Sequence, residues 1–177
     1  MANRHLRGDI HPLIVGVRST VVIAAGDLLF SNTTAGITPS FNTSADNLAY
    51  PLTDFMATTG GVFAAGIISK NFLGVAMQDS QSGVTEKITV ATAGVFRFPL
   101  HTAHVPGGVT IGSKVSAVSR EITAGTGTGV SSGHVIMNTS NPGSTCYLGY
   151  CVKTESGASF VDFQLRTAFG PGGVVGQ

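Results

Sequence analysis

A Gly-x-Ser-x-Gly pentapeptide, Gly129–Gly133, has the spacing of the nucleophile elbow of α/β-hydrolases. An elbow needs a strand before the serine, a helix after it, and then an acid and a histidine further along the chain. Here a run of Gly and Thr precedes the motif, the β-like residues His134–Met137 follow it, and no histidine lies beyond His134. We therefore interpret Gly129–Gly133 as a loop.

Two histidines lie close together in the sequence, and so do the two cysteines. His101 and His104 have a spacing that could share a metal ion, but no third ligand lies near them in the sequence, so we favour ordinary loop histidines over a metal site. Cys146 and Cys151 are five residues apart and would face opposite sides of a continuous strand. We expect both to be packing residues; a disulfide across a bulge at Gly149 is the alternative.

No other constellation suggests catalysis. The segment Gly125–Gly129 resembles a phosphate-binding loop only in its glycine content, because the lysine and the helix N-terminus that such a loop needs are missing. The nine Asp and Glu residues show no pairing typical of general acid–base chemistry. The sequence therefore predicts a protein that is not an enzyme, with no catalytic residues, cofactor or metal.

The composition is poor in charge. Charged residues are 11% of the chain, against about 25% in ordinary domains, and Gly supplies 24 of 177 residues. The net charge of +1 is spread along the chain, which argues against direct nucleic-acid binding and against a membrane-surface patch. A weakly charged surface suggests contact with other protein subunits; an extracellular-type β protein is the alternative. No apolar stretch follows the N-terminus, so we expect no secretory signal.

Two segments repeat one pattern of strand, Ser-Gly turn and strand. The first is Phe72–Phe98, with its turn at Ser82–Gly83, and the second is Tyr147–Ala168, with its turn at Ser156–Gly157. A repeated hairpin predicts an all-β fold of small β-barrel or β-tulip-like modules.

Aligning the two copies extends the repeat. Gly26–Phe30 corresponds to Gly112–Ser116, each as a turn leading into a strand, and Gly74 corresponds to Gly149. A glycine inside a strand often marks a bulge or a close backbone approach. Period-two alternation then separates a buried face from a solvent face. The expected buried residues are Ile88, Val90, Val161, Phe163 and Leu165, and the expected solvent-facing residues are Thr85, Lys87, Thr89, Asp162, Gln164 and Arg166.

The rest of the chain is arranged around this repeat. Residues 31–60, rich in Thr, Ser and Asn, are expected to form a long loop with a short helix near residues 45–58. The predicted division is an N-terminal arm at 1–17, a β domain at 18–168 made of two related units at about 18–100 and 101–168, and a flexible tail at 169–177.

The first hairpin resembles a known family. Phe72–Ala76, a polar hairpin, Ile88–Val90 and Ala93–Phe98 look like the core of tailed-bacteriophage head decoration proteins of the lambda type. In that family a G-I-L-A-like strand precedes a hairpin that ends in S-G-T-F-R.

Further segments are similar to the related capsid-cement (stabilising) proteins. Gly94–Pro99, Gly112–Ser116 and Leu148–Cys151 correspond to motifs of the form G-V-F-x-L-P, G-D-x-V-Y and G-x-A. The chain departs from these proteins in its extra length, in residues 31–60, and in having Gly112-Ser-Lys in place of Gly-Asp.

The resemblance implies a structural virion protein, made in the host cytoplasm, that binds the outer surface of the phage head and stabilises the capsid by bridging capsomers. Its implied partner is the major capsid protein, and a homo-oligomer, with a trimer favoured, is expected. The N-terminal arm could add a strand to an exposed sheet edge of the capsid. The candidate contact residues in that arm are Arg4, His5, Leu6, Arg7, Asp9, Ile10, Pro12 and Leu13.

Two other functions stay open. One is a different virion component, such as a head-fibre base or a tail-tube protein. The other is a carbohydrate-binding β module, which is disfavoured because Trp is absent and aromatic residues are only 7% of the chain.

Overall fold

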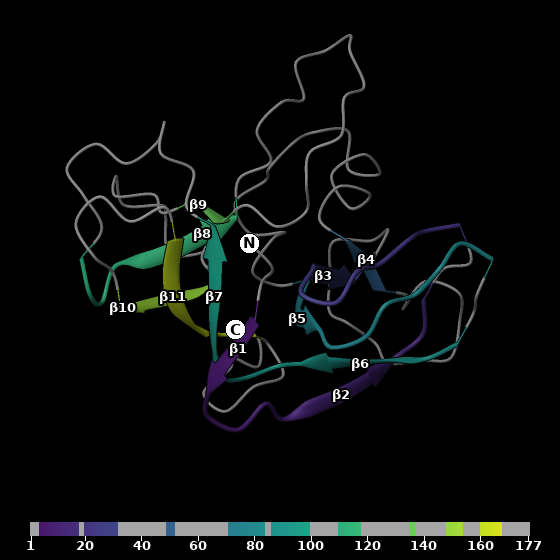
Figure 1. Cartoon of the computed structure of the whole chain (residues 1–177), viewed down its shortest axis with the longest axis horizontal. Coiled ribbons are helices and arrows are strands. Elements are labelled where there is room, and N and C mark those ends of the chain that lie inside the picture. Colours follow the sequence, from purple (N-terminus) through teal and green to yellow (C-terminus); the bar gives the residue numbers. More distant parts are fainter. Residues whose placement is uncertain are drawn as a thin grey trace, which may run out of the picture.

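The computed structural model describes residues 4–17, 20–31, 49–51, 71–83, 86–99, 110–117, 135–136, 148–153 and 160–167. These residues form two antiparallel sheets, so the predicted all-β class is confirmed. In Figure 1 the strands β7 to β11 lie on the left, β3 to β5 lie on the right, and β2 and β6 run along the bottom.

One sheet has five strands and the other has six. The five-stranded sheet contains, in spatial order, β2 (Pro12–Val15), β6 (Ile88–Ala91), β5 (Phe72–Ala76), β3 (Leu28–Ser31) and β4 (Ala49–Pro51). The six-stranded sheet contains β1 (Arg4–Arg7), β7 (Val95–Pro99), β11 (Phe160–Leu165), β10 (Gly149–Lys153), β8 (Lys114–Ala117) and β9 (Val135–Ile136).

Both predicted hairpins are present, as β5 with β6 and as β10 with β11. In the first, Val75 lies opposite Ala91; in the second, Tyr150 lies opposite Gln164. The repeat aligns Gly74 with Gly149 and therefore Val75 with Tyr150, so their partners Ala91 and Gln164 occupy equivalent positions in the second strands of the two hairpins.

The correspondence extends across each sheet. The spatial order β2-β6-β5-β3-β4 in one sheet matches β7-β11-β10-β8-β9 in the other, and β1 is an additional strand beside β7. The outer pairs also agree: Ile14 lies opposite Thr89, and Arg97 lies opposite Asp162. The two units thus run from β2 to β6 and from β7 to β11, and the division between them falls between Ala91 and Val95, earlier than residue 100.

The turn that leads into β3 and the turn that leads into β8 are built with the same hydrogen bonds. Within the turns, the Asp27 N–H donates to the Ala24 carbonyl and the Ser113 N–H donates to that of Thr110. Gly26 and Gly112 have φ of 96° and 87°, values that favour glycine at the third position of such a turn. The glycine that the sequence places before each of these strands is therefore explained by the positive φ that the turn requires.

These two glycines also fix each turn to the neighbouring hairpin. The Gly26 N–H donates to the Ala76 carbonyl and the Gly112 N–H to that of Cys151, at 2.8 Å in both cases. Since Ala76 and Cys151 occupy equivalent positions in β5 and β10, the same long-range contact is made twice.

Gly74 and Gly149 allow the close strand approach that the sequence predicts. A Cβ atom at Gly74 would collide with the carbonyl oxygen of Ala91 on β6, and a Cβ at Gly149 would collide with that of Gln164 on β11. Any side chain at these positions would push the hairpin strands apart. The prediction of close backbone approach is confirmed at both positions.

The core is one cluster with contributions from both sheets. Phe30 and Phe72 pack with ring centroids 5.4 Å apart, and Phe98 and Phe163 with centroids 5.2 Å apart. All four rings are fully buried, as expected for the largest apolar side chains of a small domain.

Two predictions about local structure are wrong in part. The long loop expected at residues 31–60 is interrupted by β4, which pairs with β3, and this strand also replaces part of the helix expected near 45–58. The rest of that segment lies outside the described residues. Tyr50 and Ala49 are buried on the sheet, and this long-range pairing outweighs the weak local preference for helix.

Asp162 was assigned to the solvent face, but it is only 3% exposed. The rest of the predicted alternation is largely correct: Val161, Phe163 and Leu165 are buried, and Gln164 is exposed.

Candidate interaction surface

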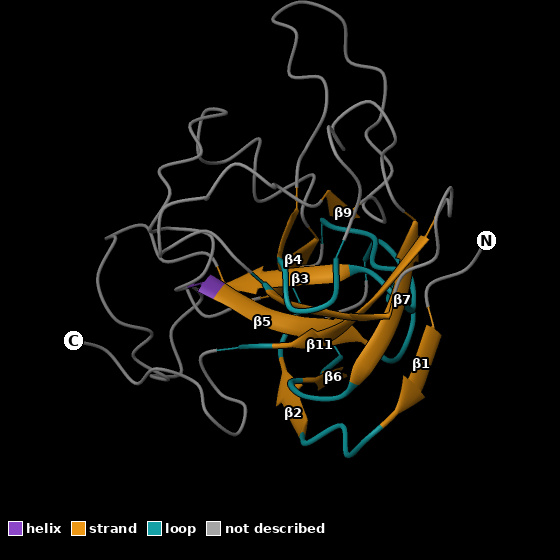
Figure 2. Ribbon diagram, turned by 90° about the vertical axis from the view of Figure 1, so that its left-hand side faces the viewer, coloured by secondary structure: helices purple, strands orange, loops and turns teal. Residues whose placement is uncertain are grey.

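The segment predicted to be a capsid-contact arm is part of both sheets. β1 pairs with β7 through Arg4 opposite Arg97 and His5 opposite Phe96, whereas β2 pairs with β6. The chain passes from one sheet to the other through residues 8–11, along one side of the molecule (Figure 2). These residues therefore join the two sheets.

The candidate contact residues divide by exposure. Arg7, Asp9 and Pro12 are exposed, and Leu6 is half-buried. Ile10 and Leu13 are half-buried and pack against the core. The side chains of Arg4 and His5 lie outside the described residues, although their backbone positions in β1 are defined. Only the exposed members can contact a partner directly.

The end of the predicted arm belongs to the core. Val15 and Val17 are 8% and 2% exposed. The Ala49 N–H donates to the Gly16 carbonyl at 2.9 Å, and Val17 forms a parallel bridge with Ala49. Residues 15–17 therefore hold the two outer strands of the five-stranded sheet together, and they are unsuited to act as a free arm.

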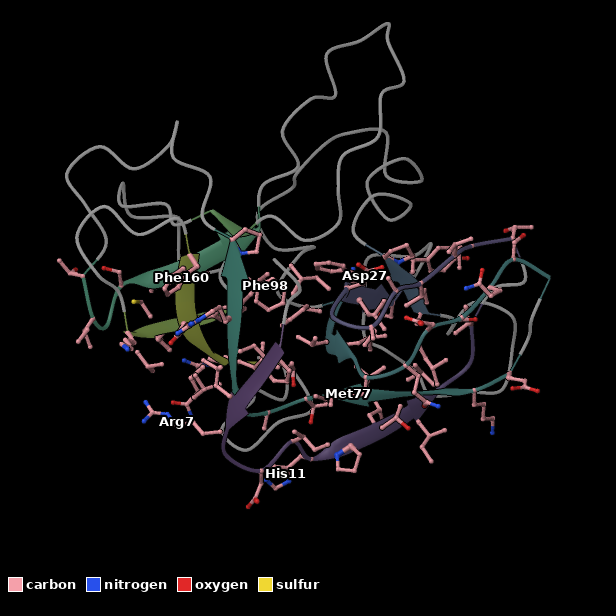
Figure 3. All side chains as sticks on the ribbon, viewed as in Figure 1. Arg7, His11, Asp27, Met77, Phe98 and Phe160 are labelled. Atoms are coloured by element: carbon pink, nitrogen blue, oxygen red, sulfur yellow. The ribbon has the colours of Figure 1, made fainter. Side chains whose placement is uncertain are left out.

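A hollow of about 380 Å³ lies where the chain crosses between the sheets. Its polar lining includes Arg7, Asp9, His11 and Gln164. Arg7 and His11 project outward from the ribbon (Figure 3). His11 has φ of 41°, an uncommon value for a residue with a side chain. The hollow offers both charge signs at an open site, which fits a polar contact with another protein surface.

An ion pair that the sequence did not suggest lies on the six-stranded sheet. Arg97 donates from Nε to Asp162 Oδ1 at 2.7 Å and from its Nη2 to Oδ2 at 2.9 Å, and its guanidinium lies 4.1 Å from the Phe160 ring centroid. The two partners are 65 residues apart, so no local pattern predicts the pair. Bidentate pairing satisfies a carboxylate that burial would otherwise destabilise.

A second polar contact joins β10 to the residue that follows β11. Arg166 donates to the Tyr150 hydroxyl at 2.9 Å. The equivalent positions in the other unit hold Ala93 and Val75, so this contact, like the Arg97–Asp162 pair, distinguishes the two repeats.

Cys151 is buried and free, consistent with the predicted packing role. Burial raises the pKa of its thiol from the ordinary value of 9.0; the nearby Asp162 carboxylate adds to the rise, and a backbone hydrogen bond at Lys153 opposes it. A protonated, enclosed thiol is a poor nucleophile.

The other sequence candidates cannot be placed. His101, His104, Cys146 and the Gly129–Gly133 motif lie outside the described residues. Within the described ranges, no group of three or more His, Cys, Asp or Glu side chains could hold a metal ion. No helix in that part of the chain is long and apolar enough to cross a membrane.

Comparison with known proteins adds no relative: no protein family, curated protein or solved structure matches this chain.

Proposed function

We propose that this protein is a structural component of a phage virion that binds the outer surface of the head and stabilises the capsid by bridging capsomers. Its partner would be the major capsid protein, and the protein would act as a homo-oligomer. The support is the resemblance of its β motifs to decoration and capsid-cement proteins, together with the weak surface charge.

The observation that carries the proposal is where the resembling segments lie. Phe72–Ala76, Ile88–Ala91 and Val95–Pro99 are the strands β5, β6 and β7, which lie inside the two sheets. The resemblance therefore involves the residues that determine the fold, and not a surface loop. A rigid β module repeated over a shell can bind through many weak contacts.

The contact surface that fits this role is the crossing segment between β1 and β2. Arg7, Asp9 and His11 are exposed there and line the hollow described above. Exposed charges at the rim of an interface direct association more than they add affinity. We therefore expect capsid binding to weaken with rising salt.

Co-sedimentation with phage heads tests the proposal. The purified protein should pellet with expanded heads and stay in the supernatant with unexpanded heads, because the bridged sites form only on the mature lattice. Equal sedimentation in the absence of heads would indicate self-assembly, as expected of a tail-tube protein, and would count against capsid binding. Failure to bind either form of head would refute the proposal.

A matched pair of variants tests the contact surface. Arg7→Ala removes an exposed charge from the crossing segment, whereas Lys153→Ala removes an exposed charge from β10. We expect the first to reduce the fraction of bound protein by several-fold and the second to leave it unchanged. Equal behaviour of the two variants would exclude the crossing segment as the contact surface while leaving the wider proposal to the head-binding experiment.

A further inference from the structure

The outer strand of one unit has a further strand paired with its free edge, whereas the outer strand of the other unit does not, within the part of the chain that the structure describes. In the six-stranded sheet, β1 covers the edge of β7 along Val95–Arg97. The equivalent residues of β2 are Pro12–Ile14, because Ile14 and Arg97 occupy matching positions opposite β6 and β11. No strand covers this edge of β2 in the part of the chain that the structure describes.

Exposure follows the same difference. Ile14 is 67% exposed, whereas the side chain of its counterpart Arg97 is 19% exposed. Pro12 is exposed, whereas its counterpart Val95 is only 8% exposed. A large apolar side chain on an uncovered strand edge is the usual mark of a position that another strand can occupy.

The hydrogen bonds show which backbone groups point to the open edge. The Thr89 carbonyl accepts from the Met77 N–H, and the Thr89 N–H donates to Gln78 Oε1, so the Thr89 backbone points away from β2. Because Ile14 lies opposite Thr89, its own N–H and C=O point away from β6. Gly16, two residues after Ile14, points the same way, because its carbonyl accepts a hydrogen bond from the Ala49 N–H on the side of β2 that faces away from β6.

The open edge is therefore short and has a fixed set of polar groups. Ile14 offers an N–H and a C=O, whereas Pro12 offers only a C=O, since proline has no N–H. Beyond Ile14 the edge is occupied by Ala49 of β4. Any added strand must bond to β2 within Pro12–Ile14.

We propose that this edge is a self-association surface on which β2 of a second copy pairs antiparallel about a two-fold axis. The pairing places Leu13 opposite the partner's Leu13. Each Ile14 N–H then donates to the C=O of Pro12 in the other copy, which gives two hydrogen bonds.

Shifting the pair by one residue in either direction gives a less favourable register. Centring the pair on Ile14 would place the partner's Pro12 beside Gly16, where Ala49 already lies. Centring it on Pro12 would place two residues without an N–H opposite each other. The register centred on Leu13 is the one that stays within the open segment and forms both bonds.

Charge also favours a second copy. Pro12–Ile14 carries no charged side chain, so two copies can approach without repulsion, and each Ile14 packs beside a proline of the other. β1 includes the exposed cation Arg7, so pairing this strand with itself would bring like charges together. This proposal is independent of the capsid-binding role.

Sedimentation equilibrium of the full chain tests the surface. Between about 10 µM and 1 mM, the range in which weak complexes dissociate, we expect a reversible monomer–dimer equilibrium. Ile14→Lys should raise the dissociation constant by about tenfold or more, since it places a charge at the pairing edge. The control is Val22→Lys, which also replaces an exposed apolar residue, 54% exposed, but lies outside the strands, and it should have no effect.

A second variant tests the proposed register in the opposite direction. Pro12→Val introduces the residue found at the equivalent position of β7, Val95, and supplies the missing N–H donor. It should strengthen the dimer, because it adds two hydrogen bonds to the symmetric pair. A chain that stays monomeric throughout, a dimer insensitive to Ile14→Lys, or a dimer unchanged or weakened by Pro12→Val would overturn the proposal.

Discussion

At the scale of single residues, Gly74 and Gly149 are required for the same reason in two places. Both lie in the first strand of a hairpin, and both face a carbonyl of the second strand. Because the two contacts are equivalent, they can be tested side by side.

Gly149→Ala should destabilise the protein by about 2–3 kcal/mol, since the added methyl group forces β10 and β11 apart. Gly74→Ala should cost at least as much, because Gly74 also has a positive φ of 144°. Gly83→Ala is the control: its φ is 90°, but no atom lies within 4 Å of an added Cβ, so strain alone should cost about 1 kcal/mol. Urea denaturation of the three variants measures these differences, and equal losses would contradict the steric explanation.

The contribution of the Arg97–Asp162 pair to stability can be tested by replacing it with the residues at the equivalent positions of the other unit. Arg97→Ile leaves a buried carboxylate without its partner and should cost about 3–5 kcal/mol. The double variant Arg97→Ile/Asp162→Thr copies the equivalent pair of the other unit, Ile14 and Thr89, and should recover most of that loss. Denaturation of the single and double variants provides the comparison. If the double variant were no more stable than Arg97→Ile, the loss of stability in Arg97→Ile would not come mainly from the unpaired Asp162 carboxylate.

At the scale of elements, the hairpins could be predicted from the sequence and the roles of the terminal strands could not. β5 with β6 and β10 with β11 join strands that are close in the chain, so apolar alternation and Ser-Gly turns suffice to identify them. β1 and β2 pair with strands more than 70 residues away, and nothing local distinguishes a strand that will add to a distant edge from a free arm. The burial of Asp162 was missed for the same reason.

Two deletions separate the roles of β1 and β2. Removing residues 1–8 takes away β1 and uncovers β7, and we expect a folded, less stable protein. Removing residues 1–17 also takes away β2 with the buried Val15 and Val17, and should abolish cooperative folding because the core loses two side chains and an entire strand pairing. Circular dichroism during denaturation distinguishes the two. A cooperative transition in the longer deletion would show that β2 is dispensable.

At the scale of the whole molecule, the two units share one core. The buried cluster joins Phe30 and Phe72 of one sheet to Phe98 and Phe163 of the other. The crossing segment from β1 to β2 further ties the sheets through the backbone. The molecule should therefore behave as one cooperative unit despite its internal repeat.

We expect a single unfolding transition, with the calorimetric enthalpy equal to the van't Hoff enthalpy. Core truncations in different units, Phe72→Ala and Phe163→Ala, should each lower the midpoint of that one transition, because each opens a cavity in the shared cluster. Differential scanning calorimetry measures both quantities. Two separable transitions, each shifted by only one of the variants, would show that the units fold independently.

The turns that precede β3 and β8 bear on the origin of the internal repeat. Their glycine and their long-range hydrogen bonds are the same in both units, although few of the surrounding side chains are. A tandem gene duplication would leave this pattern, since backbone geometry persists while side chains diverge. The ancestor would then have been a chain of half this length that associated in pairs, and the present core between the sheets would descend from a contact between two separate molecules.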